Sequence, residues 1–88
     1  MNKHKNTYLS ILKNPVQSNI DWKDVESMLK YLGAKISERE GSRIGIEING
    51  VIAVFHRPHP QKETDKGAVR SMQKYLNNAG ITKKSFDK

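Results

Sequence analysis

Apolar positions recur with a helical period at three places in the chain. The pattern predicts a short helix over residues 5–13, a longer helix after Asp21 that ends at Gly33, and a last helix from residue 64 or 65 to 78. Asp21 suits a helix N-cap, and glycine suits the residue that follows a helix C-terminus. The apolar positions of the three stripes are Tyr8, Ile11, Leu12, Trp22, Val25, Met28, Leu29, Leu32, Val69, Met72, Leu76 and Ala79.

Between the second and third helices the apolar period changes to two, which is typical of β-strands. The pattern predicts strands at residues 34–38, 43–48 and 51–56. Asn49-Gly50 separates the last two and indicates a hairpin, because a type I′ turn needs a positive φ at both central residues. The predicted fold class is α+β, in the order helix, three antiparallel strands and helix, with an additional short helix in front.

A two-residue turn at Asn49-Gly50 also predicts which residues of the hairpin face each other. Six apolar side chains then share one face, which is expected to pack against the helices: Ile44, Ile46, Ile48, Val51, Ala53 and Phe55. On the opposite face Arg43 is expected beside His56, with Cβ atoms ~5 Å apart. Gly45 lies next to this pair and is expected to leave room for the backbone of a ligand.

Arg43 and His56 together have the chemistry of a phosphate site. A guanidinium binds two non-bridging oxygens at once, and an imidazole moves a proton near neutral pH. Cleavage of RNA without a metal needs a base for the 2′-hydroxyl, an acid for the 5′-oxygen and a cation for the transition state. His56, His59 and Arg43 are the candidates for these roles. The alternative interpretation is that His56 is a solvated strand residue and His59 a loop residue between two prolines.

Charge supports a polyanionic ligand. The chain has 16 Lys and Arg against 9 Asp and Glu, a net charge of +7, and such an excess is typical of proteins that bind nucleic acid. Lys66, Arg70 and Lys74 form a basic stripe along the last helix, where phosphate contact is expected. The alternative interpretation of this stripe is an ordinary solvated helix face. The chain has no cysteine, which excludes disulfides and thiolate zinc sites; no metal and no cofactor is expected.

The hydropathy pattern gives no sign of a membrane protein. The longest apolar stretch, residues 51–55, is too short to cross a bilayer. The first six residues do not resemble a signal peptide. A cytoplasmic location and no membrane partner are therefore expected.

A series of short motifs runs from Trp22 to Ile81. They are the helix end Tyr31-Leu32-Gly33, the turn Gly41-Ser42, the pair His59-Pro60, the helical segment Gly67-Ala68-Val69-Arg70-Ser71, and the helix end Asn78-Ala79-Gly80. In this order and spacing they resemble the HicA family of messenger-RNA-cleaving toxins.

The resemblance implies a double-stranded-RNA-binding-domain-like fold, α-β-β-β-α, over residues 21–81. Residues 1–20 are then an N-terminal extension with the additional helix, and residues 82–88 are expected to be a flexible tail. It also implies an endoribonuclease (an mRNA interferase) that acts on mRNA, and a HicB-family antitoxin that covers its active face in a hetero-oligomer. Ser42 of the turn joins the basic stripe as an expected RNA-binding residue.

One departure from the family pattern concerns the expected catalytic residue. The family has a catalytic histidine directly after the Gly-Ser turn, and Arg43 stands there in this chain. Either the histidine has moved to the adjoining strand as His56, or the protein binds RNA without cutting it. A ribonuclease toxin and a non-catalytic RNA-binding module therefore both stay open. DNA binding is less favoured, since no helix-turn-helix spacing is present.

Overall fold

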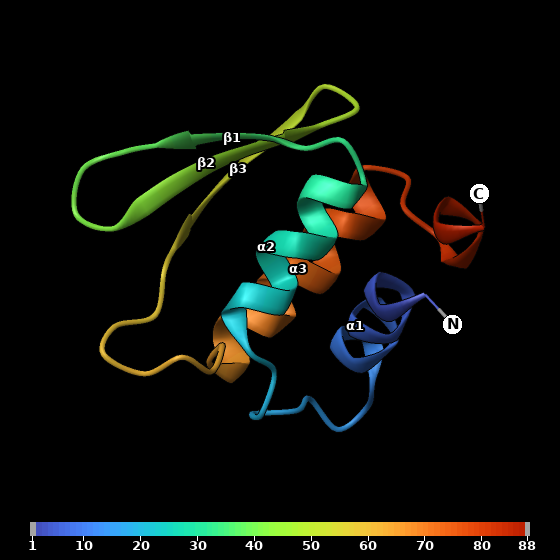
Figure 1. Ribbon diagram of the computed structural model, residues 1–88, viewed down its shortest axis with the longest axis horizontal. Coiled ribbons are helices and arrows are strands. Elements are labelled where there is room, and N and C mark those ends of the chain that lie inside the picture. Colours follow the sequence, from blue (N-terminus) through green and yellow to red (C-terminus); the bar gives the residue numbers. More distant parts are fainter. Residues whose placement is uncertain (1, 88) are drawn as a thin grey trace.

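The computed structural model describes residues 2–87, and its elements follow the predicted order (Figure 1). The elements are α1 (Lys3–Leu12), α2 (Trp22–Tyr31), β1 (Lys35–Glu38), β2 (Arg43–Ile48), β3 (Val51–His56), α3 (Lys66–Asn78) and the 3₁₀ helix η1 (Lys83–Phe86). The strands form one antiparallel sheet in the order β1-β2-β3. The predicted α+β class is confirmed, since α2 precedes the three strands in the chain, α3 follows them, and the additional helix α1 comes first.

The β2–β3 hairpin has the register that the sequence predicted. Ile44 pairs with Phe55, and Ile46 with Ala53. The turn residues Asn49 and Gly50 have φ values of 51° and 81°, as a type I′ turn requires. Because side chains alternate across a strand, this register fixes which residues face the helices and which face away from them.

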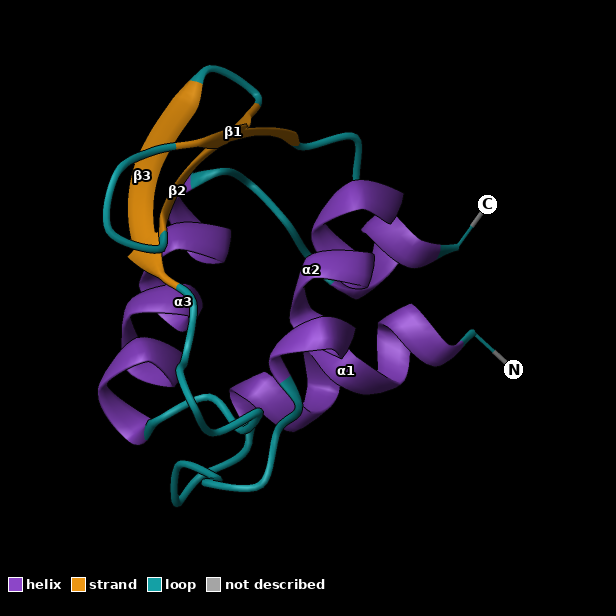
Figure 2. Ribbon diagram, turned by 60° about the vertical axis from the view of Figure 1, so that its left-hand side comes forward, coloured by secondary structure: helices purple, strands orange, loops and turns teal. Residues whose placement is uncertain are grey.

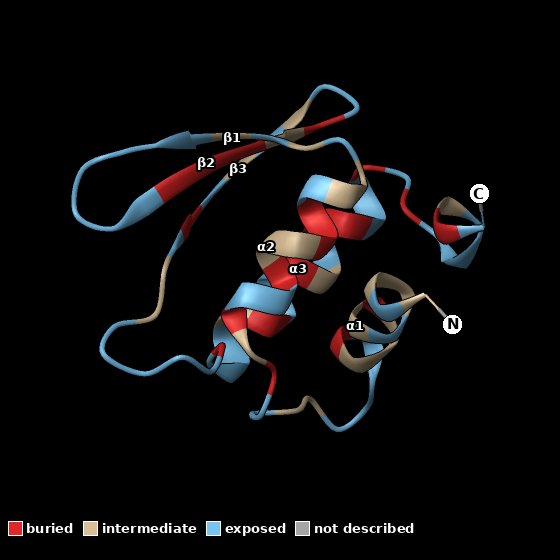
Figure 3. Cartoon of the chain, in the orientation of Figure 1, coloured by how far each residue is buried: buried red, intermediate tan, exposed pale blue. Residues whose placement is uncertain are grey.

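Helices α2 and α3 cover one face of the sheet, and α1 packs on their other side (Figures 1 and 2). Of the strand residues beneath them, Ile44, Ile46, Ile48 and Phe55 are buried, whereas Val51 and Ala53 are partly buried. Figure 3 shows the buried stretch along β2. Tyr75 of α3 joins the two layers, since its hydroxyl donates a hydrogen bond of 2.8 Å to the Val51 carbonyl. The core also contains Trp22, Val25, Met28, Leu29, Val69, Met72 and Leu76. The opposite face of the sheet has no covering element within residues 2–87 (Figure 2).

The two long core helices begin and end at the residues that the sequence indicated. The Asp21 side chain accepts a hydrogen bond from the Lys23 amide, and Gly33 after α2 has a φ of 84°. At the start of α3 the Asp65 side chain accepts from the Ala68 amide at 2.8 Å. These bonds satisfy amides that a helix end leaves without partners.

The C-terminal segment differs from the expectation of a flexible tail. Residues Lys83–Phe86 form η1, and the Phe86 ring is buried. This ring packs against Tyr8 of α1 and Tyr31 of α2, with ring centroids 5.1 and 5.9 Å apart. Burial of this large aromatic side chain packs the segment on the core, so the expectation is corrected for residues 83–86.

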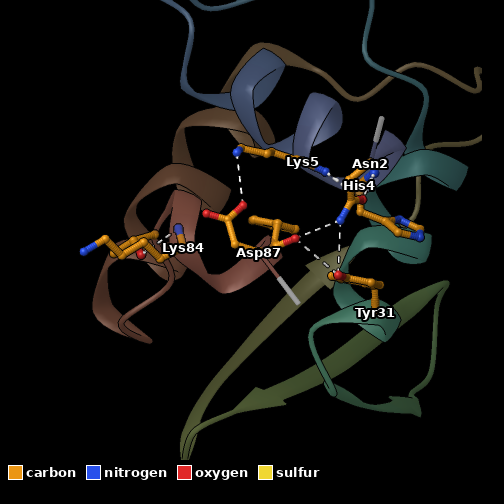
Figure 4. Close-up of polar contacts among 8 residues, drawn as sticks. Asn2, His4, Lys5, Tyr31, Lys84 and Asp87 are labelled. Atoms are coloured by element: carbon orange, nitrogen blue, oxygen red, sulfur yellow. Dashed lines mark hydrogen bonds and ion pairs between the residues drawn. The ribbon is translucent and has the colours of Figure 1, made fainter.

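The N-terminal helix α1 and its N-cap residue contact this C-terminal segment (Figure 4). Asn2 caps α1 and also donates to the Phe86 carbonyl at 3.0 Å. Lys5 forms an ion pair of 3.2 Å with Asp87. His4 precedes the predicted start of this helix by one residue, yet it is part of α1, and its ring stacks on Tyr31. The ends of the described chain thus lie together, away from the start of β2 (Figure 1).

Candidate nucleic-acid interface

The uncovered face of the sheet, called here the outer face, carries three rows of side chains. Each row takes one residue from each strand or its extension, as the strand pairing requires. Arg39 belongs to the third row because its amide donates to the Arg43 carbonyl at 2.8 Å and so continues the β1–β2 pairing. The rows are Lys35, Glu47 and Ile52; Ser37, Gly45 and Val54; and Arg39, Arg43 and His56.

The predicted pairing of Arg43 with His56 is present in this last row. Both side chains are exposed. The Arg43 Nε donates to the Glu40 carbonyl at 3.0 Å, so the guanidinium is anchored at the β1–β2 turn. A guanidinium and an imidazole on neighbouring strands, both open to solvent, can reach the same phosphate.

Ser42 ties the β1–β2 turn to the end of β3. It has a φ of 65°, and its carbonyl accepts a hydrogen bond of 2.9 Å from the Arg57 amide. This bond extends the hairpin one step beyond the Arg43–His56 pair. Ser42 is therefore next to the candidate site, with its side chain exposed.

His59 lies in the connection between β3 and α3, beyond the sheet, and is exposed. Among the hydrogen bonds within residues 2–87, none involves the side chain of His56 or His59. The structure thus brings Arg43, His56 and Ser42 to one corner of the outer face. His59 follows on the loop that leaves this corner.

Arg57 is a residue of this corner that the sequence analysis did not single out. Its Nε is 2.7 Å from a carboxylate oxygen of Glu26 in α2, and its Nη1 is 2.6 Å from one of Glu38 in β1. Glu26 also accepts a hydrogen bond from the Trp22 indole. The Arg57 guanidinium lowers the pKa of both carboxyl groups through these hydrogen bonds, and they in turn raise the pKa of Arg57. Through these two ion pairs Arg57, the residue that follows His56, is held to both α2 and β1.

The space over Gly45 is occupied, contrary to the expectation that a ligand backbone would approach there. The Arg39 guanidinium lies over this residue. A Cβ at position 45 would be 2.6 Å from Arg39 Nη2 and 2.7 Å from Nε, closer than non-bonded atoms allow. Gly45 is therefore buried on an otherwise open face, and Arg39 adds a third cationic group that the sequence pattern did not reveal.

The basic stripe of α3 lies in the other layer of the molecule. Lys66, Arg70 and Lys74 are exposed, whereas the buried side of α3 packs into the core. The helix layer covers the inner face of the sheet (Figure 2). The structure thus places the stripe and the Arg43–His56 pair in different layers, and the loop over residues 57–65 connects them.

No three His, Asp or Glu side chains gather within residues 2–87 in a way that could hold a metal ion. No helix in this part of the chain is long and apolar enough to cross a membrane.

A three-stranded antiparallel sheet with helices on one face and a basic outer face defines a small α+β domain of the double-stranded-RNA-binding type. Residues 22–81 match the family model described as HicA toxin of bacterial toxin-antitoxin. The chain belongs to this HicA toxin family. The matched region contains the sheet with α2 and α3, and leaves α1 and η1 outside. Comparisons with curated proteins and with solved structures gave no match.

Proposed function

We propose that this protein is an endoribonuclease toxin that cleaves messenger RNA in the cytoplasm with its own side chains. The observation that carries the proposal is the cross-strand pairing of Arg43 with His56. The resemblance to the family places a histidine directly after Gly41-Ser42, and His56 supplies an imidazole beside that position from the next strand.

The reaction follows from the groups at this corner. His56 takes the proton of a ribose 2′-hydroxyl, and the resulting oxygen attacks the adjacent phosphorus. The bond between phosphorus and the 5′-oxygen breaks, and His59 donates a proton to that oxygen. Arg43 binds the non-bridging oxygens as negative charge develops on them. The products are a 2′,3′-cyclic phosphate and a free 5′-hydroxyl, and the proposed step uses no metal or cofactor.

The alternative function is a non-catalytic RNA-binding module of the same fold. It is supported by Arg43, which stands at the position of the family's histidine and is anchored to the Glu40 carbonyl. It is also supported by the two imidazoles, since no hydrogen bond within the described residues orients either of them. Such a module would bind RNA through the same cations and leave it intact.

The toxin family also supports a proposal about partners. A basic toxin needs a neutralising protein in the cell, and a HicB-family antitoxin with an acidic surface over Arg43 and His56 would supply it. RNA and antitoxin then compete for the same corner. Ser42, Lys66, Arg70 and Lys74 extend the proposed RNA contacts from this corner to the helix layer.

The test is cleavage of a single-stranded RNA by the purified wild type and by His56→Ala. Loss of a general acid or base typically lowers the rate about 10²–10⁴-fold, and the exposed side chain of His56 leaves the core untouched. His59→Ala is expected to have a smaller effect. His4→Ala is the matched control, because it removes an imidazole from α1, at the other end of the molecule (Figure 1).

Two results would decide against catalysis by His56. Folded His56→Ala that cleaves as fast as the wild type would remove the assignment. A wild type that binds RNA but never produces a 2′,3′-cyclic end would support the non-catalytic module instead.

A further inference from the structure

The outer face contains a second cationic position besides the Arg43–His56 pair. The Arg39 side chain is exposed, but it does not point straight away from the sheet. Its guanidinium lies along the sheet, above Gly45 of the neighbouring row. The absence of a side chain at position 45 makes this placement possible, because a Cβ there would collide with three guanidinium atoms.

The charge of Arg39 is available for a ligand. Arg39 takes part in none of the ion pairs within residues 2–87. Glu47 is the only carboxylate among the nine outer-face residues, and it pairs across the strands with Lys35, whose charge offsets its own. The row that contains Arg39 carries no acidic side chain.

A hollow of about 250 Å³ adjoins the Arg39 guanidinium on this face. Arg39, Lys35, Glu47 and Ile52 are among the residues that line it. Ile52 is 63% exposed, and Val54 beside Gly45 is 46% exposed. The hollow therefore offers a cation together with an open apolar surface, a combination suited to the phosphate and the base or ribose of one nucleotide.

We infer that Arg39, seated on Gly45, binds the RNA phosphate next to the one held by Arg43 and His56. Rows on one face of a strand are about 6.6–6.8 Å apart, a distance comparable with the separation of neighbouring phosphates in a polynucleotide. A single strand that crosses the outer face along β2 then meets one guanidinium in each of two rows. The inference rests on the proposed function only in assuming that the ligand is RNA.

Binding can be measured apart from cleavage with a single-stranded RNA whose 2′-hydroxyls are all methylated, since this probe lacks the attacking group. The variants are Arg39→Ala, Gly45→Ala and the two combined. Lys83→Ala of η1 is the matched control, because it removes the same charge from an exposed position far from the outer face (Figure 1). The dissociation constant of each protein is measured over a series of salt concentrations.

Arg39→Ala is expected to raise the dissociation constant several-fold. It should also reduce the slope of log affinity against log salt by about 0.7, the value of one phosphate contact in a single strand. Gly45→Ala should give the same loss by displacing the guanidinium. The double variant should be no worse than either single variant, because both remove one contact. Lys83→Ala should leave the slope unchanged.

Three outcomes would overturn the inference. The first is a slope of log affinity against log salt that Arg39→Ala does not alter. The outer face would then be a surface for a protein partner and not for RNA. The second is additive losses in the double variant, which would mean that Gly45→Ala acts through the strand rather than through Arg39. The third is a wild type that does not bind the methylated RNA. Failure of the catalytic proposal looks different, since unmethylated RNA would then stay intact while the Arg39 effect on binding persists.

Discussion

Arg43 of β2 lies directly opposite His56 of β3, in the row of the sheet nearest the β1–β2 turn. Cross-strand partners have Cβ atoms ~5 Å apart, so an imidazole at either position can face the same phosphate. The hairpin therefore provides two alternative places for an imidazole beside the Gly41-Ser42 turn. Substitutions at positions 43 and 56 can therefore test whether His56 replaces the histidine that the family has in place of Arg43.

We predict that Arg43→His restores activity lost through His56→Ala. In the double variant the imidazole returns to the place after Gly41-Ser42 that the family resemblance implies, beside the same phosphate. Cleavage by wild type, His56→Ala, Arg43→His and the double variant is compared on one RNA, with folding checked by circular dichroism. We expect the double variant to cleave faster than His56→Ala, which alone loses about 10²–10⁴-fold. It should cleave more slowly than the wild type, because it lacks the Arg43 guanidinium that stabilises the transition state.

Ile52→His is the control for this experiment. It places an imidazole on the same face of β3, two rows away from the corner, and should not rescue His56→Ala. Rescue by Ile52→His as strong as by Arg43→His would show that the position of the imidazole is unimportant, which contradicts the strand-exchange interpretation.

A second prediction concerns the contacts of Arg57. Glu26 and Glu38 have pKa values below their ordinary range because each accepts hydrogen bonds from this guanidinium. A carboxyl group with a lower pKa in the folded state stabilises the fold above its unfolded pKa, and this contribution disappears as the pH falls through the folded pKa. The free energy of unfolding should therefore decrease as the pH falls below about 4.5.

Glu26→Gln should remove much of this dependence. At pH 7 we expect it to lower the free energy of unfolding by roughly 1 kcal/mol, since the pair is only partly buried and solvent screens it. The measurement is urea unfolding at pH 7 and pH 3. Glu40→Gln changes an exposed carboxylate without an ion pair in the described chain, so it should leave both values unaltered. A Glu26→Gln variant with the wild-type pH profile would show that the ion pair is not the source of acid sensitivity.

The sequence predicted the strand register and the helix ends that position the site, because both depend on interactions between residues close in the chain. A two-residue Asn49-Gly50 turn permits one register, and that register alone brings Arg43 and His56 together. The caps at Asp21 and Gly33 likewise follow from the backbone needs of helix ends. Each of these features involves residues close in sequence or linked by one tight turn.

The features that were missed depend on side chains that meet across the fold. Arg57 forms ion pairs with Glu26 and Glu38, which lie on two other elements. The periodicity of apolar residues along the sequence contains no information about such ion pairs. The glycine at position 45 indicated open space above the sheet for a ligand. The Arg39 side chain, which comes just after β1, folds over Gly45 and fills that space. Phe86 is a single apolar residue without a repeating neighbour, so its burial could not be read from a pattern.

The last prediction concerns the basic stripe of α3, which lies in the layer opposite the outer face. If RNA contacts both layers, the strand must pass around the loop that joins β3 to α3. The double variant Arg70→Ala, Lys74→Ala should then reduce the salt slope for single-stranded RNA by about 1.4, which is two contacts at about 0.7 each.

The matched control is Lys83→Ala with Lys84→Ala, which removes two exposed charges from η1. It should leave the slope as in the wild type, since η1 lies beside α1 and away from the outer face (Figure 1). RNA length distinguishes the two cases further. The salt slope for an oligonucleotide that is only long enough to cover the outer face should not change when Arg70 and Lys74 are replaced. If the α3 variant keeps the wild-type slope with long and short RNA alike, the stripe is a solvated helix face and RNA binding belongs to the sheet.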